Sequence, residues 1–395
     1  MTAPSFVLSD FSMRPPRFRV PQERLLEWLG EAHTEAQLAT DAVAPDAETR
    51  DELAARMNRV IRRCACGPSQ IAARGTSLPD LGDSHWSEHT TYAPTEAPHG
   101  PPLAERTRRF TEIALAYLDD EYAQVETPPA DLVHVTCTGY ESPSAAQRLV
   151  ARRGWGERTR VTHAYHMGCY ASLPALRIAA GCAVTGQTDS ADPARRALPQ
   201  VDIVHTEICS LHLDPTLHSI EQLVVQSLFA DGFIRYSLRA AAAASRGPGL
   251  RLVATHEAIL PDSAASMTWI PSEWGHRMTL ARDVPERIAG ALRGFVTELY
   301  RRAGRTPAAL RDSVFAVHPG GPRIIDRVGA VLELQPPQLA QSRAVLFDHG
   351  NMSSATLPHV WMRVLADPAV APGTLVASLA FGPGLTCSGG LFEKQ

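Results

Sequence analysis

The stretch that decides the fold is His166-Met167-Gly168-Cys169-Tyr170-Ala171-Ser172-Leu173-Pro174-Ala175-Leu176, where a glycine precedes a cysteine and small, apolar residues follow. The apolar run predicts a buried helix over residues 170–180, ended by Gly181. Cys169 then lies where a turn enters a helix, and the free N–H groups and helix dipole there favour a thiolate. A thiolate in apolar surroundings accepts acyl groups well, although a lone buried cysteine is more often simple packing.

The composition is that of a globular protein long enough for two core-bearing units, with 395 residues, 44% hydrophobic and 20% charged. The net charge of −4 gives no electrostatic argument for binding nucleic acid or an anionic membrane. The seven cysteines form no disulfide or zinc framework, so we expect a reducing, cytoplasmic environment and no metal or redox cofactor. No apolar run approaches about 18 residues, so no membrane span is expected.

Short apolar strands alternate with helices along the chain, which predicts an α/β protein with parallel-rich sheets covered on both faces. Residues 1–20 are expected to form an extended arm, and the Ser-, Thr- and Pro-rich segment 75–102 a long loop. A linker at 245–249 separates an N-terminal unit, 1–247, from a C-terminal unit, 248–395. The expected helices are 21–39, 47–65, 103–122, 145–153, 219–230 and 284–303, and the expected strands are 132–138, 201–209, 250–255, 313–317, 344–347 and 375–380.

Two further reactive side chains directly follow predicted strands, where the active sites of α/β sheets gather. His318 follows the strand 313–317, and Asn351 follows the strand 344–347. Taken singly, His318 is more often a histidine whose hydrogen bonds are only structural, and Asn351 is more often a residue that forms a turn or a helix cap. Together with Cys169 they suit acyl transfer, in which the thiolate takes an acyl group from a thioester. His318 and Asn351 would then donate hydrogen bonds to the thioester oxygen, each worth about 3–4 kcal/mol.

Papain-type cysteine proteases also combine Cys, His and Asn, and they are the alternative class for these residues. His318 lies well downstream of Cys169, as that class requires. However, Cys169 lacks the Cys-Gly-Ser-Cys-Trp-like flank near a mature N-terminus, and the chain has no secretory context.

A series of short motifs runs in one order along more than half of the chain: His166-Met167-Gly168-Cys169, Thr206-Glu207-Ile208-Cys209, Leu228-Phe229-Ala230-Asp231-Gly232, Asp283-Val284-Pro285, Val317-His318-Pro319-Gly320-Gly321-Pro322, Gly350-Asn351-Met352-Ser353-Ser354 and Phe381-Gly382-Pro383-Gly384-Leu385-Thr386. In these motifs the chain resembles the type III polyketide synthases, the chalcone synthase-like branch of the thiolase superfamily. The resemblance implies a thiolase-like fold, two related lobes in αβαβα layers, working as a homodimer. It also implies that Cys169 is the nucleophile and that His318 and Asn351 are the oxyanion and decarboxylation pair.

The same resemblance implies which residues bind the substrate. Phe229 matches a gatekeeper ring between the substrate tunnel and the cavity, and Met278 stands at the second gatekeeper position. Trp269 replaces a small cavity-lining glycine of the family, and Cys209 and His212 replace cavity threonines. A cavity narrowed by Trp269 suits few extension cycles.

The acyl donor is expected to be acyl carrier protein or CoA. The family's plant members hold CoA phosphates with basic residues on and after an early helix, ending in an Ile-Lys-Lys-Arg-like stretch. The matching stretch here, 71–74, reads Ile-Ala-Ala-Arg and has lost both lysines. The preceding helix keeps a set of arginines: Arg56, Arg59, Arg62 and Arg63.

The stretches 137–144 and 162–170 most resemble a bacterial subgroup of stand-alone ketosynthases. These enzymes join two β-ketoacyl chains into an α-pyrone, as in myxopyronin-type antibiotic pathways. The resemblance implies that the loop 138–144 reaches into the partner's cavity of the dimer. Glu141 would then be a candidate base that removes a proton from the second chain. An apolar cavity would raise the pKa of its carboxyl group and so make it a better base. The alternative is a surface or loop-capping glutamate.

We therefore expect a cytoplasmic, homodimeric acyltransferase that forms carbon–carbon bonds by Claisen condensation, with neither nucleic acid nor membrane as partner. One alternative is a type III polyketide synthase that extends a starter with malonyl-CoA. Another is a ketosynthase III-like initiation enzyme of fatty-acid synthesis, and a third is a non-catalytic thiolase-fold scaffold. The sequence leaves the acyl chain length, the number of condensations and the product open.

Overall fold

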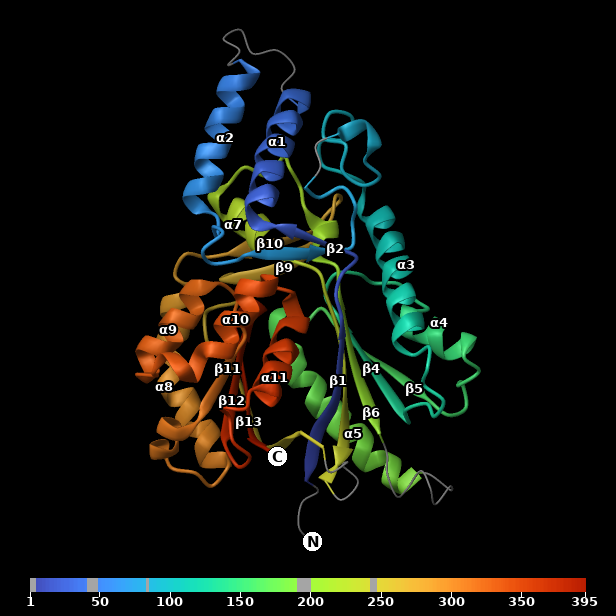
Figure 1. Cartoon of the computed structure of the whole chain (residues 1–395), viewed down its shortest axis with the longest axis vertical. Coiled ribbons are helices and arrows are strands. Elements are labelled where there is room, and N and C mark those ends of the chain that lie inside the picture. Colours follow the sequence, from blue (N-terminus) through green and yellow to red (C-terminus); the bar gives the residue numbers. More distant parts are fainter. Residues whose placement is uncertain (1–4, 41–48, 83–84, 190–199, 242–246) are drawn as a thin grey trace.

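One nine-stranded sheet runs through the computed structural model, which describes residues 5–40, 49–82, 85–189, 200–241 and 247–395 (Figure 1). The strand order is β11-β12-β13-β8-β1-β7-β6-β4-β5. The central strand β1, Phe6–Arg14, pairs antiparallel with β7 and with β8 and joins two parts of the sheet. The remaining strands are β4 Asp131–Thr136, β5 Arg160–Tyr165, β6 Val201–Glu207, β7 Gly232–Ala240, β8 Leu250–Ile259, β11 Val314–Val317, β12 Leu375–Gly382 and β13 Thr386–Lys394.

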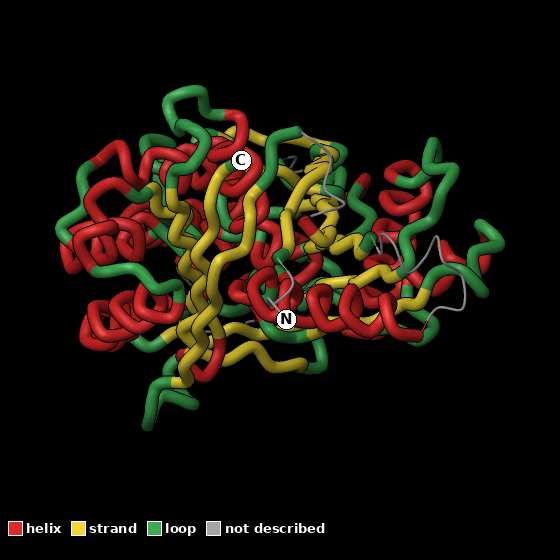
Figure 2. Tube along the Cα trace, turned by 90° about the horizontal axis from the view of Figure 1, so that it is seen from below, coloured by secondary structure: helices red, strands yellow, loops and turns green. Residues whose placement is uncertain are grey.

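Helices cover both outer faces of the sheet and also fill the space between its two parts (Figures 1 and 2). The inner helix α5 contacts β4, β6 and β7 on one side and β13 on the other. The second inner helix, α11, contacts β7 and β11. The helices are α3 Leu103–Glu121 and α4 Ala145–Arg152 on one outer face, α5 Ser172–Asp189 and α11 Thr356–Ala366 inside, and α8 Val284–Arg302, α9 Pro322–Leu332 and α10 Ala340–His349 on the other outer face.

The apolar strands are buried on both faces because each part of the sheet lies between two helical layers. In β4, Val133 and Val135 belong to the core cluster of α5 and α11, whereas Leu132 packs with α3. A third cluster joins α8 and α9 to β11, β12 and β13. This arrangement gives five layers, helix, strand, helix, strand and helix. None of the helices in the described ranges is long and apolar enough to cross a membrane.

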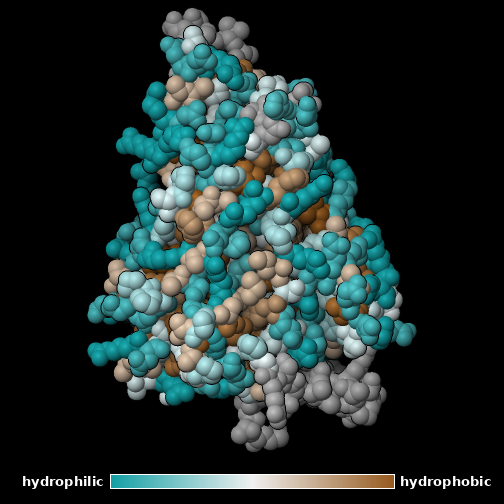
Figure 3. Space-filling view, in the orientation of Figure 1, coloured by the Kyte–Doolittle hydropathy of each residue, from teal (hydrophilic) through white to brown (hydrophobic). Residues whose placement is uncertain are grey.

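A smaller assembly lies above the sheet in Figure 1. Helices α1 (Gln22–Thr40) and α2 (Arg50–Cys64) pack side by side, and strand β2 (Phe18–Pro21) pairs with β3 (Ala73–Thr76). The hairpin β9 (Met267–Pro271) and β10 (His276–Leu280) and the helix α7 (Ile220–Leu228) lie beneath them. Hydrophilic side chains cover most of this side of the molecule, and apolar ones gather around its middle (Figure 3).

Most of the predicted helices are confirmed, but one predicted strand is wrong. Residues 344–347 lie inside the helix α10, because a four-residue apolar run fits a buried helix as well as a strand. The helix predicted to end at Gly181 continues to Asp189, since a single glycine costs a helix interior only about 1 kcal/mol. The predicted helix 47–65 begins at Arg50 as α2, and its first two residues lie outside the described ranges.

The sheet differs from the prediction in two ways. It is mixed rather than parallel-rich, since only the pairs β4–β5, β4–β6 and β11–β12 are parallel in its described strands. The predicted N-terminal arm, whose first four residues are not described, contains β1, the strand that joins the two parts of the sheet. Its partners lie more than two hundred residues downstream. The predicted linker 245–249 is only partly described, and the division at 247/248 stays a prediction.

Leu176 of α5 is fully buried between the two parts of the sheet. Leu176→Ala is expected to lower the free energy of unfolding by about 2–5 kcal/mol, because it removes buried contacts and leaves a cavity. The matched control, Leu38→Ala on the exposed end of α1, should change it by less than about 0.5 kcal/mol. Urea denaturation followed by circular dichroism measures both values, and equal effects would contradict this position of α5.

Candidate active site

Cys169 lies in a short 3₁₀ turn, Gly168–Tyr170, that leads into α5. Gly168 adopts a left-handed conformation with φ of 73°, which glycine reaches without strain. A Cβ atom at Gly168 would come within 2.8 Å of the ring of Pro383, which follows β12. The glycine therefore allows the turn to approach Pro383 closely, and this approach sets Cys169 beside a chain segment from the far end of the sequence.

A small pocket opens at Cys169. Its lining is mainly apolar, and no Asp, Glu, Lys or Arg of the described ranges contributes to it. The structure places five of the predicted substrate-binding residues in the wall: Cys209, His212, Phe229, Trp269 and Met278. The pocket thus suits an uncharged acyl chain next to a thiol.

The hairpin β9–β10 forms one wall of the pocket. Trp269 and Met278 are partners across the hairpin, and His276 lies on the same face because side chains alternate along a strand. The indole Nε1 of Trp269 donates a hydrogen bond to the carbonyl oxygen of Cys137 (2.6 Å), which holds the ring in place. Trp269 therefore narrows the pocket in a fixed orientation.

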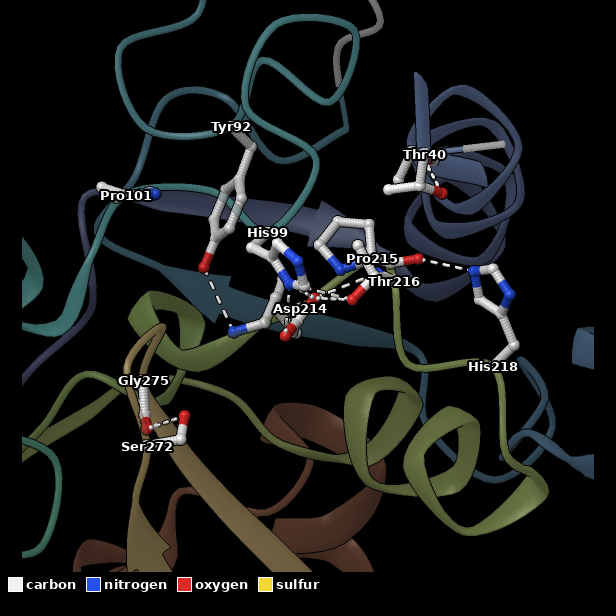
Figure 4. Close-up of polar contacts among 12 residues, drawn as sticks. Thr40, Tyr92, His99, Pro101, Asp214, Pro215, Thr216, His218, Ser272 and Gly275 are labelled. Atoms are coloured by element: carbon white, nitrogen blue, oxygen red, sulfur yellow. Dashed lines mark hydrogen bonds and ion pairs between the residues drawn. The ribbon is translucent and has the colours of Figure 1, made fainter. Parts of the chain in front are cut away.

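Hydrogen bonds hold the tip of this hairpin and, separately, the neighbouring loop around His99 (Figure 4). The Ser272 hydroxyl donates to the Gly275 carbonyl (2.7 Å), and the ring of Trp274 stacks on His99 at 4.7 Å. His99 contacts the Asp214 carboxylate through Nδ1 (3.2 Å), and the Thr216 hydroxyl donates to the same carboxylate (2.7 Å). The hairpin is thus held at two places, by the hydrogen bond from Trp269 to Cys137 and by the stacking of Trp274 on His99.

Asn351 and Phe229 are neighbours through a short parallel β-bridge. The Asn351 side-chain oxygen accepts a hydrogen bond from the backbone N–H of Ser353 (2.9 Å), which orients the carboxamide. The side chains of Asn351 and Ser353 both act on the Cys169 sulfur as hydrogen-bond partners and lower the pKa of its thiol against the effect of burial. Cys169 and Asn351 are therefore brought together, as the sequence predicts.

His318 follows β11, and its backbone N–H donates to the Leu379 carbonyl of β12 (2.7 Å). Because β12 runs on to Pro383, His318 is held one strand away from the segment that packs on Gly168. The imidazole is buried, and neither ring nitrogen has a partner among the described residues. Burial lowers the pKa of His318 to about 3, so the ring is neutral at pH 7. His318 is not among the residues that line the pocket.

The ionisation state of Cys169 differs from the expectation of a stabilised thiolate. Burial, and then the carboxylate of Glu207, raise the pKa of the Cys169 thiol to about 12. A helix dipole contributes about 0.3–1 kcal/mol, which is less than one pKa unit. Desolvation therefore outweighs the position at the helix start, and the protein without substrate holds a neutral thiol.

Comparisons with known proteins agree with this architecture. Residues 251–394 match the C-terminal domain of chalcone and stilbene synthases. Type III polyketide synthase C of Arabidopsis thaliana is 31% identical over 268 residues, which cover 67% of this chain and 67% of that protein. Bisdemethoxycurcumin synthase of Oryza sativa subsp. japonica is 31% identical over 286 residues, covering 70% of this chain and 69% of that enzyme.

The chain belongs to the type III polyketide synthases. The crystal structure of PKS-I from the brown alga Ectocarpus siliculosus covers all of both chains with a TM-score of 0.81 at 22% identity. This likeness confirms the predicted thiolase-like fold. As a type III polyketide synthase, the protein is an acyltransferase that carries out Claisen-type condensation.

Two predicted binding features of this polyketide synthase lie outside the pocket of the single chain. Glu141 pairs with Arg148 (3.0 Å) on the loop before α4, with its side chain 35% exposed, so its role as a base stays a prediction for the dimer. Arg74 is buried and donates to the carbonyls of Gln226 (2.8 Å) and Phe229 (2.7 Å). It therefore supports the gatekeeper segment rather than presenting a charge for CoA phosphates.

The hairpin β9–β10 was not predicted from the sequence, and neither was the role of His276, which lines the pocket of the synthase. The available signal was the alternation of Met267 with Trp269 and of His276 with Met278 around a turn at 271–275. Apolar and aromatic residues at every second position on both sides of a Pro- and Gly-containing turn predict a hairpin.

The raised pKa of Cys169 predicts how its alkylation depends on pH. Below a pKa of about 12 the thiolate fraction grows with pH, so the rate of iodoacetamide labelling at Cys169 should rise about tenfold per unit between pH 7 and 10. Peptide mapping by mass spectrometry measures the rate at this residue. Free cysteine in the same solution is the control and should level off above about pH 9. A rate at Cys169 that is already constant from pH 7 would contradict a neutral thiol.

Proposed function

We propose that this type III polyketide synthase joins two β-ketoacyl chains and releases an α-pyrone, working as a homodimer on thioesters. The observation that carries the proposal is the small, uncharged pocket at Cys169, whose wall Trp269 lines in a fixed orientation. Such a pocket has room for one acyl chain and little room for repeated extension. A reaction that ends after one condensation fits this shape.

In the proposed first half-reaction, Cys169 is acylated. The neutral imidazole of His318 accepts the thiol proton, and the sulfur attacks the thioester carbonyl of the first β-ketoacyl chain. The carbon–sulfur bond to the donor breaks, and the donor thiol leaves with that proton. Asn351, already a hydrogen-bond partner of Cys169, donates to the oxyanion formed on the way.

In the second half-reaction, the other β-ketoacyl thioester loses a proton from the carbon between its two carbonyls. Glu141 of the partner subunit is the proposed base, and His318 and Asn351 donate to the enolate oxygen. The carbanion attacks the acyl carbonyl on Cys169, so a carbon–carbon bond forms, the bond to the sulfur breaks, and the departing thiolate takes up the proton that Glu141 removed. An enol oxygen then attacks the remaining thioester, which closes the six-membered ring and releases the second donor thiol.

The second candidate function is extension of a Cys169-bound starter by malonyl-CoA with loss of carbon dioxide. The relatives named type III polyketide synthase favour it. Product analysis separates the two candidates. A pyrone that contains both supplied acyl chains supports the proposal. If malonyl-CoA releases carbon dioxide and the product contains only one supplied chain, the second candidate function would be correct and the proposal would be wrong.

Removing the nucleophile should abolish acyl transfer. Cys169→Ala is expected to show no added acyl mass after incubation with a β-ketoacyl thioester and to lose pyrone formation by at least about a thousandfold. Intact-protein mass spectrometry and product chromatography measure the two effects. The matched control is Cys209→Ala, another buried thiol of the same pocket, which should still gain the acyl mass. Acylation of the Cys169→Ala protein would refute the assignment.

The donor is proposed to be an acyl carrier protein, because Arg74 is buried and exposed arginines remain on α2. Helix α2 packs on α7, whose Val225 lines the pocket. Reversing the charge of this face with Arg59→Glu and Arg63→Glu together should lower kcat/KM for a carrier-protein thioester at least about fivefold, since charges at an interface rim steer association.

The matched measurement uses the N-acetylcysteamine thioester of the same acyl chain, which has neither a protein nor a nucleotide. Its kcat/KM should change by less than about twofold in the double variant. Arg305→Glu, an exposed arginine after α8, is the control for a general charge effect. An equal loss with both thioesters would show that the α2 arginines do not recognise the carrier.

A further inference from the structure

The polar side chains of the pocket wall are almost all engaged in hydrogen bonds. Gln222 donates from Nε2 to the Met278 carbonyl (2.6 Å), and Gln226 donates from Nε2 to the Asp214 carbonyl (3.0 Å). Among the lining residues that the structure describes, only His276 has a buried side-chain polar atom without a partner, its Nε2. His276 is 3% exposed, so bulk water does not satisfy this atom.

The neighbouring His212 determines which nitrogen of His276 carries the hydrogen. The backbone N–H of His276 donates to His212 Nδ1 (3.1 Å), so His212 must carry its hydrogen on Nε2. That Nε2–H points to the Thr138 carbonyl oxygen (2.8 Å) and lies 3.4 Å from His276 Nδ1. Because Nδ1 of His276 faces an N–H group, it has to be the acceptor. The hydrogen of a neutral His276 is therefore on Nε2, the atom without a partner.

Both rings are neutral at pH 7. Burial lowers the pKa of His276 to about 4, with smaller contributions from His166 and the guanidinium of Arg106. Burial also lowers the pKa of His212 well below its usual value, followed by the effect of His276. Arg106 is itself buried and donates to backbone carbonyls, so a fixed positive charge lies behind the two rings. Each histidine thus offers one N–H donor and one acceptor.

The His276 ring is held by aromatic neighbours on several sides. Tyr140 meets it edge-on at 5.1 Å, and Trp269 and His166 lie 5.5 and 5.8 Å away. The hydroxyl of Tyr140 is a second buried atom without a partner in the described residues. His276 therefore combines a fixed ring in the wall of the pocket that opens at Cys169 with an N–H group that no described residue accepts.

We propose that the Nε2–H of His276 donates a hydrogen bond to the β-keto oxygen of the acyl chain on Cys169, and that this contact selects β-ketoacyl chains over saturated ones. The inference rests on the proposed function and names the feature of the substrate that is recognised. A chain without the keto group would leave the buried donor unpaired, which costs the desolvation of that group. Sites built to hydrogen-bond a substrate reject analogues without the partner atom for this reason. His212 acts as a positioning residue that sets the tautomer.

A competition experiment tests the proposal. The full-length protein is incubated with equal amounts of the N-acetylcysteamine thioesters of a β-ketoacyl chain and of the saturated chain of the same length, and the masses added to Cys169 are compared. The wild type should prefer the keto chain by at least about tenfold, and His276→Leu should remove this preference. His276→Gln, which keeps an N–H donor, should retain part of the preference. Arg277→Leu, at the exposed next position of β10, is the matched control and should behave as the wild type does.

The outcomes separate this inference from the proposed function. A wild-type preference in both His276 variants would overturn the role of His276, even if Cys169 is acylated normally. If neither thioester acylates Cys169 in the wild type, the proposed function would be overturned instead. The tautomer gives an independent reading that does not need a variant to fold. In ¹⁵N-histidine-labelled protein the nitrogen that carries the hydrogen in His276 should be Nε2, and a protonated Nδ1 would contradict the derivation.

Discussion

The close approach of Gly168 to Pro383 is the contact on which the site depends. Cys169 belongs to the first half of the sequence and Pro383 to its last strand–turn–strand segment, and the missing Cβ of Gly168 lets the two backbones meet. The helix α5 that follows is buried between the two parts of the sheet, so the turn has no freedom to move away. Cys169 and Asn351, which come from segments far apart in the sequence, can therefore meet, and His318 is held one strand away from the same turn.

Burial determines the protonation state of this site more than any ion pair does. The pocket has no charged side chain among its described lining residues, and its thiols and imidazoles are held in their neutral forms. The buried carboxylate of Glu207 accepts hydrogen bonds from Thr138 (3.0 Å) and from the Cys137 backbone (3.1 Å), and it raises the pKa of the neighbouring thiols further. At pH 7 these thiols and imidazoles are therefore in their neutral forms before a substrate binds.

The sequence allows the catalytic elements to be predicted because each lies beside a local signal. Cys169 precedes a small-residue helix, and His318 follows an apolar strand that is confirmed as β11. Asn351 was placed after a strand that is in fact the helix α10, yet it still reaches Cys169, so the motif was more informative than the assigned element. The strand β1 could not be predicted because its pairing with β7 and β8 is set by residues far along the chain. The prediction of a thiolate at Cys169 was wrong for a related reason. The burial that raises the pKa of this thiol arises only in the folded chain and cannot be read from the residues next to Cys169 in the sequence.

The hairpin β9–β10 places four pocket side chains on one ribbon outside the large sheet. The hairpin takes no part in the nine-stranded sheet, and four of its side chains, Met267, Trp269, His276 and Met278, line the pocket at alternate positions. Substitution of His276 would change the polarity of the pocket, whereas Met267 and Met278 also belong to the apolar cluster of α8 and α9, so substitutions there would alter the core as well. A small set of mutations on one ribbon therefore offers a route by which evolution or protein engineering can diversify the products of a single scaffold.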